Sequence, residues 1–242
     1  MPLFHAAVAK AGGQLQVLDL TGQTLGDCEF HHCLLLEVFA TNAATLTELH
    51  LDTAYYWSPD SIRTLLVAAP ALQLFAASVL INDRHVARAM LRNEPPFQAL
   101  QIQDVSCHLD ATADVVALCS DLRCHASLVK LHLCNAKLNT AAAMSAVVDA
   151  CIALRPRKLW LGGCCAVPAV LSQLTRLISA GALRELVVYN DGVEMFDAAH
   201  ESTRLFVAAV HASAMTRLRL INLGVTPEDV VEAEAFINDR RH

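Results

Sequence analysis

The sequence has few aromatic residues and no excess of positive charge. Aromatic side chains make up only 5% of the 242 residues, whereas hydrophobic residues of all kinds make up 55%. The core is therefore predicted to be aliphatic, and so apolar a chain is not expected to be disordered. The formal net charge is −6, which argues against a general nucleic-acid binder, so no nucleic-acid partner is expected.

Signals of secretion and of membrane insertion are also missing. The first ten residues have no basic start, and Lys10 interrupts their apolar stretch, so no signal peptide is predicted. The nine cysteines are odd in number and lack framework spacing, which indicates reduced thiols in the cytoplasm or nucleus. The uncharged stretch 65–81 is at the lower limit for a membrane span, and Pro70 and Gln73 interrupt it. We therefore expect no membrane contact.

Catalytic motifs do not occur either. The sequence has no Walker loop, G-x-G-x-x-G, H-E-x-x-H, G-x-S-x-G or EF-hand loop. Eleven histidines could be combined with acidic residues into triads, but nothing in the sequence fixes their geometry. We expect a protein that is not an enzyme and that has no cofactor.

One cluster of zinc-type ligands lies in "CEFHHC", which holds Cys28, His31, His32 and Cys33. If the segment is helical, Cys28 and His32 share a face, whereas His31 and Cys33 point elsewhere. No Cys-x-x-Cys pair completes the set. The pattern favours a mixture of surface and core side chains, and metal binding by these four residues stays an open alternative.

The sequence does contain a repeat. "LVKLHLCNAKL" places leucines at Leu128, Leu131, Leu133 and Leu138, and "LQVLDLTGQTL" at 15–25 has the same offsets. The pattern L-x-x-L-x-L-x-x-(N/C/A)-x-L fits eight times, 25 to 32 residues apart, with starts at 15, 46, 72, 97, 128, 156, 183 and 215. Alternating apolar residues are typical of a strand with one buried face. Strands are therefore predicted near 17–21, 48–52, 74–78, 99–103, 130–134, 158–162, 185–189 and 217–221.

Helical segments separate these strands. Ser58 before Pro59 is a helix start signal, Thr140 can begin another helix, and Gly181 can end one. The leucine pattern, its period and these helices resemble the leucine-rich repeat, in its ribonuclease-inhibitor-like subclass. The resemblance implies an α/β solenoid shaped as a horseshoe, with a parallel β-sheet on the concave side and α-helices on the convex side. It also implies a single domain of about eight repeats over residues 1–242.

The two ends of such an array differ from its interior, because each has a neighbouring repeat on one side only. Residues 1–14 are predicted to be the helix half of an incomplete first repeat, and residues 226–242 a C-terminal capping helix. Arrays of repeats need polar caps, and the first strand near Leu18 is preceded only by the N-terminal helix. We therefore expect either a longer parent chain or an oligomer that covers this edge.

The side chains between the leucines should share the face of the sheet that points away from the core. The first copies place Asp19, Glu48 and Asp52 there, whereas the later copies place cations and aromatic rings. Exposed Trp, Tyr and Arg side chains dominate the energetics of protein interfaces. The predicted partner-binding residues are Lys130, His132, Lys158, Trp160, Glu185, Tyr189, Arg217 and Arg219. Their charge would attract a protein partner with an acidic patch.

The leading hypothesis for function is thus a non-catalytic protein–protein interaction scaffold that binds its partner on the concave sheet face. One alternative is the substrate-recognition arm of an F-box-type ubiquitin-ligase adaptor, because "LLVAAPALQLF" at 65–75 resembles a phrase of F-box leucine-rich-repeat proteins. The other alternative is a GTPase-regulating leucine-rich-repeat protein. The sequence does not identify the partner, the pathway or the oligomeric state.

Overall fold

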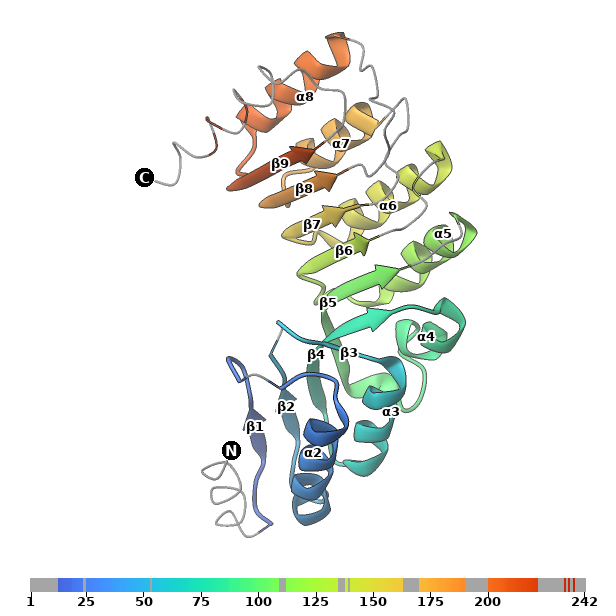
Figure 1. The fold of residues 1–242 in the computed structure, drawn as a ribbon, viewed down its shortest axis with the longest axis vertical. Coiled ribbons are helices and arrows are strands. Elements are labelled where there is room, and N and C mark those ends of the chain that lie inside the picture. Colours follow the sequence, from blue (N-terminus) through green and yellow to red (C-terminus); the bar gives the residue numbers. More distant parts are fainter. Residues whose placement is uncertain are drawn as a thin grey trace. The chain divides into compact units, whose positions relative to one another are not determined.

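The chain divides into two compact units, seen in a computed structural model that describes residues 13–23, 25–52, 54–108, 112–134, 138, 140–162, 170–189 and 200–221, together with 233, 235 and 237. Unit 1 comprises Met1–Ile81 and His85–Val105, and unit 2 comprises Asn82–Arg84 and Ser106–His242. Each unit is a layer of parallel strands alternating with helices (Figure 1). The single domain stays a prediction. Residues 1–12 and most of 226–242, where the two end helices were predicted, lie outside the described residues.

The strands of unit 1 lie in the order β1-β2-β4-β5. Strand β3 pairs with a later part of β4 than β2 does. The pairs β1–β2, β2–β4 and β3–β4 are parallel. Leu18 lies opposite Leu49, and Leu49 lies opposite Phe75, so equivalent positions of successive copies of the sequence pattern pair with one another. The elements are β1 (Val17–Asp19), α2 (Glu29–Asn42), β2 (Glu48–His50), β3 (Tyr56–Trp57), α3 (Pro59–Ala68), β4 (Leu74–Ile81), α4 (Arg84–Leu91) and β5 (Leu100–His108), the last two crossing the unit boundary.

Unit 2 repeats the same arrangement with strands β6, β7, β8 and β9, each parallel to the next. Leu131, Leu159, Leu186 and Leu218 lie opposite one another across these strands. Helix α6 contacts α5 and α7, and α7 contacts α8, which leaves the helices side by side along one face of the strands (Figure 1). The elements are α5 (Thr112–Asp121), β6 (Lys130–Cys134), α6 (Ala141–Leu154), β7 (Lys158–Leu161), α7 (Val170–Ser179), β8 (Glu185–Tyr189), α8 (His200–Ala212) and β9 (Arg217–Ile221).

Local signals in the sequence explain where several helices begin and end. The Ser58 hydroxyl accepts a hydrogen bond from the Ser61 N–H before α3, and the Thr140 hydroxyl accepts one from the Ala143 N–H before α6. Gly181 follows α7 with φ +80°, a conformation that glycine adopts without a Cβ clash. The prediction of these three boundary residues is confirmed.

The uncharged stretch 65–81 is divided between two elements. It supplies the end of α3, a turn at Pro70 and the whole of β4. Strand β4 includes the strand predicted near 74–78. Across the described ranges, none of the helices is both long enough and apolar enough to span a membrane.

The core of both units is aliphatic. Leu49, Leu65, Leu131 and Leu159 have no exposed surface, and burial of such side chains is the main favourable contribution to folding. The two tryptophans differ, because Trp57 is fully buried in β3 whereas Trp160 is only partly covered in β7. Trp160 is therefore the tryptophan that a partner can reach.

Candidate functional site

The eight predicted partner-binding residues all lie on strands β6–β9 of unit 2, and we refer to them together as the β6–β9 patch. Their side chains alternate with the buried leucines, so they share the face opposite the core. The strand register arranges most of them in two rows across the sheet. One row is Lys130, Lys158, Glu185 and Arg217, and the other is His132, Trp160, Val187 and Arg219.

Trp160 is the centre of the β6–β9 patch. The Lys130 Nζ lies 4.5 Å from the centroid of the indole ring, and the Arg217 Cζ lies 5.7 Å from it. Both cations are thus within the range of cation–π attraction. The His132 ring meets the indole edge to face, with centroids 5.0 Å apart. Residues from two strands, β6 and β9, therefore converge on the aromatic ring of a residue on β7.

The indole N–H of Trp160 has no partner among the residues that the structure describes. Its nitrogen is covered and donates to no carbonyl, carboxylate or hydroxyl oxygen in that part of the chain. A buried donor without an acceptor costs about 1–3 kcal/mol relative to a satisfied one. The centre of the patch thus holds a buried donor that no described residue satisfies.

Glu185 partly neutralises the positive charge of the first row. Its two carboxylate oxygens lie 3.4 Å from the Lys158 Nζ and 3.8 Å from the Arg217 guanidinium. The Lys158 and Arg217 side chains are 43% and 36% exposed, so these ion pairs are screened by water and contribute little to stability. The cations consequently stay available to a second carboxylate.

Tyr189 lies directly over Gly162. A Cβ added at Gly162 would be 1.9 Å from the Tyr189 Cζ, so the ring occupies space that only glycine leaves empty. Gly162 and the buried Val187 shape the patch, yet the sequence reasoning did not select them. Glycine directly after the last strand leucine was the available signal for Gly162. Arg219 is exposed at the end of the second row.

His132 is uncharged at neutral pH. Burial, with smaller contributions from the charges of Lys130 and His108, lowers its pKa from 6.5 to about 4. The positive charge of the β6–β9 patch near pH 7 therefore comes from lysine and arginine.

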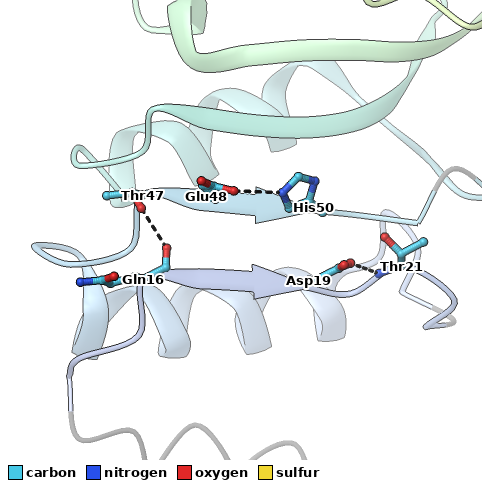
Figure 2. Close-up of polar contacts among 6 residues, drawn as sticks. All are labelled: Gln16, Asp19, Thr21, Thr47, Glu48 and His50. Carbon is cyan, nitrogen blue, oxygen red and sulfur yellow. Dashed lines mark hydrogen bonds and ion pairs between the residues drawn. The ribbon is translucent and has the colours of Figure 1, made fainter.

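The corresponding face of unit 1 is acidic. Val17, Asp19, Glu48, His50 and Asp52, which we call the β1–β2 patch, lie on or just after strands β1 and β2 (Figure 2 shows three of them). The Asp19 carboxylate accepts the Thr21 N–H, and the Glu48 Oε2 lies 3.4 Å from the His50 Nε2. The hydroxyl and the N–H of Thr21 lower the pKa of Asp19, so this carboxyl is ionised at neutral pH.

Asp52 closes the turns that follow β1 and β2. Its two carboxylate oxygens accept the backbone N–H groups of Gly22 and Ala54, both at 2.6 Å. Hydrogen bonds to a charged acceptor are about twice as strong as neutral ones. The acidic residues of the β1–β2 patch therefore also hold the local backbone.

The "CEFHHC" segment does not assemble its four side chains. Cys28 precedes α2 in an extended conformation, and its Sγ lies 3.1 Å from the His31 Nδ1. Cys28 is the residue immediately before α2, and its carbonyl oxygen accepts the His32 N–H at 2.9 Å. In the described ranges, no group of three or more His, Cys, Asp or Glu side chains is arranged to hold a metal ion.

Two buried cysteines of unit 2 lie on helices. Burial raises the pKa of the Cys119 thiol to about 12 and raises that of the Cys151 thiol as well. These thiols remain protonated and pack as small apolar side chains. They offer no activated nucleophile.

Chemically, the β6–β9 patch combines four cations, an aromatic ring and an unsatisfied donor. This combination suits the binding of anionic oxygen atoms next to an apolar surface. No family model matches the sequence of this chain, and no curated protein matches it either.

Proposed function

We propose that this chain is a non-catalytic protein-interaction scaffold that binds an acidic segment of a partner protein on the β6–β9 patch. The observation that carries the proposal is the convergence of Lys130 and Arg217 on the ring of Trp160. Carboxylates of a partner would pair with these cations, while its apolar side chains would cover the indole.

We further propose that the scaffold is a leucine-rich-repeat solenoid of the ribonuclease-inhibitor-like subclass, in which the β6–β9 patch belongs to the concave face of a horseshoe. The support is the agreement between the leucine repeat in the sequence and the repeated pairing of the strands. Leu131, Leu159 and Leu186 hold the same place in successive copies of the sequence pattern, and they also pair across the strands. A solenoid of stacked repeats requires this coincidence.

A cytoplasmic or nuclear location is part of the same proposal, since six cysteines of the described residues are free thiols. The adaptor and GTPase-regulating alternatives stay predictions. Either of them would use the same face of the strands, so binding at the β6–β9 patch is the property to test first.

The test is fluorescence anisotropy of a labelled peptide of alternating glutamate and serine, compared with the analogue in which glutamine replaces glutamate. The triple variant Trp160→Ala/Tyr189→Ala/Arg217→Glu should lose at least about tenfold in affinity for the acidic peptide. Arg204→Glu is the matched control, because Arg204 is exposed on α8. Its affinity should be unchanged.

Circular dichroism of each variant establishes that the fold is intact. Equal binding of the two peptides, or an unchanged affinity in the folded triple variant, would contradict the proposal.

A further inference from the structure

The strands of the two units carry charges of opposite sign. In the described strand residues of unit 1, every charged side chain is acidic, and these are Asp19, Glu48 and the buried Asp104. Strands β6–β9 of unit 2 instead carry four cations and one acidic residue, Glu185. One chain thus presents two electrostatically complementary surfaces.

The two patches also match in construction. Each is built on parallel strands in register, so paired backbone positions on neighbouring strands are about 4.8 Å apart in both. In the β1–β2 patch, Val17 is 49% exposed, pairs with Glu48 across the strands and lies two residues before Asp19. An exposed apolar side chain bordered by carboxylates in unit 1 therefore has a counterpart in unit 2, where Trp160 is bordered by Lys130 and Arg217.

We propose that the β6–β9 patch of one copy of this chain binds the β1–β2 patch of a second copy. This inference rests on the proposed function, because it gives the acidic partner an identity. The contact joins two different surfaces of the chain. Association therefore either closes, as a reciprocal dimer or a larger ring, or continues into longer assemblies.

Sedimentation velocity at low ionic strength is the first test. The weight-average mass of the unaltered chain should rise above the monomer value as protein concentration increases. It should return to the monomer value in about 1 M NaCl, where the screening length falls to about 3 Å. A chain that is monomeric at every concentration in low salt would overturn the inference, and so would association that salt does not weaken.

A charge exchange identifies the two surfaces. Lys130→Glu/Arg217→Glu makes both patches acidic, and Asp19→Lys/Glu48→Lys makes both basic. Each variant alone should stay monomeric, whereas an equimolar mixture should associate within about tenfold of the unaltered affinity. A mixture of two folded variants that stays monomeric rejects the pairing of these two patches.

Two further sets of variants guard against misfolding and against effects of net charge. Asp19→Asn/Glu48→Gln keeps the shape of both side chains and the hydrogen-bond acceptor for Thr21, and it should also abolish association. Glu37→Lys on α2 and Arg204→Glu on α8 change charge at exposed helix positions, and both should associate as the unaltered chain does. Loss of association in these helix controls would overturn the assignment to the strands.

Binding of the acidic peptide, measured on the same preparations, separates this inference from the proposed function. Asp19→Asn/Glu48→Gln should bind the peptide with unchanged affinity, because its β6–β9 patch is intact. If the unaltered chain binds the peptide but does not self-associate, only the present inference fails. If it does neither, both fail.

Discussion

Units 1 and 2 have the same buried pattern but opposite exposed charges. Leu49 in unit 1 and Leu131 in unit 2 occupy equivalent places in the repeat and are both fully buried. On the other face, unit 1 presents Asp19 and Asp52, whose oxygens hold backbone turns. Unit 2 presents Lys130 and Arg217, which both lie over the ring of Trp160, and Arg217 also lies near the Glu185 carboxylate. The repeat therefore fixes the core side and leaves the other side free to differ.

The largest expected effect tests whether the two cores are equivalent. Leu49→Ala and Leu131→Ala each remove a side chain with no exposed surface. We expect each to lower the free energy of unfolding by about 3 kcal/mol, because lost burial adds to the cost of a cavity. Urea denaturation of the two variants measures this. A loss below about 1 kcal/mol in one unit only would show that the shared pattern does not mean equal packing.

The next comparison concerns the exposed charges themselves. Asp52→Ala should destabilise the protein by about 1–2 kcal/mol, because the N–H groups of Gly22 and Ala54 lose a charged acceptor. Arg219→Ala, an equally drastic truncation in unit 2, should change stability by less than about 0.5 kcal/mol, since Arg219 is exposed. Thermal unfolding of both variants decides the comparison. Similar losses would mean that the charges of the β6–β9 patch are also structural.

Sequence reasoning was sufficient for the parallel strands with alternating helices, because a leucine at every second position is itself the signal for a strand with one buried face. Helix starts at Ser58 and Thr140 were equally local, since each cap needs only a hydroxyl next to the first turn. Strand β3, which buries Trp57, carries no leucine pattern and was missed.

Contacts within the β6–β9 patch depend on side-chain conformations across strands, which spacing in the sequence does not determine. The position of Tyr189 over Gly162 joins residues of neighbouring strands 27 positions apart in the chain. The same holds for the cations around Trp160. The alternation in each strand predicted which side chains share the face, whereas their mutual contacts required the register and the rotamers.

A smaller effect should appear as a pH dependence of stability that arises from His132 in unit 2. The folded pKa of His132 is about 4, below the ordinary histidine pKa of 6.5, so between these values the unfolded chain binds a proton that the folded chain excludes. Stability should therefore fall as the pH drops through this window, by about 1–2 kcal/mol once solvent screening of this half-buried ring is allowed for. Urea denaturation from pH 7 to 4 measures the fall.

His132→Gln should remove this part of the pH dependence, and His50→Gln in unit 1 is the matched control that should not. An NMR titration of the His132 ring provides a direct check. A midpoint near the ordinary histidine pKa of 6.5 would contradict the assignment of burial as the cause of the pH dependence.

The smallest expected change in stability accompanies a measurable change in binding. Glu185→Gln removes the negative charge that the exposed Lys158 and Arg217 share, and pairs of this kind contribute less than about 0.5 kcal/mol. The same substitution leaves both cations unneutralised, so affinity for the acidic peptide should increase about threefold. Glu37→Gln, an identical change on α2 of unit 1, should alter neither quantity. If Glu185→Gln instead weakens binding of the peptide, then Glu185 holds Arg217 in place over Trp160. Glu185 would then have the same structural role in unit 2 that Asp52 has in unit 1.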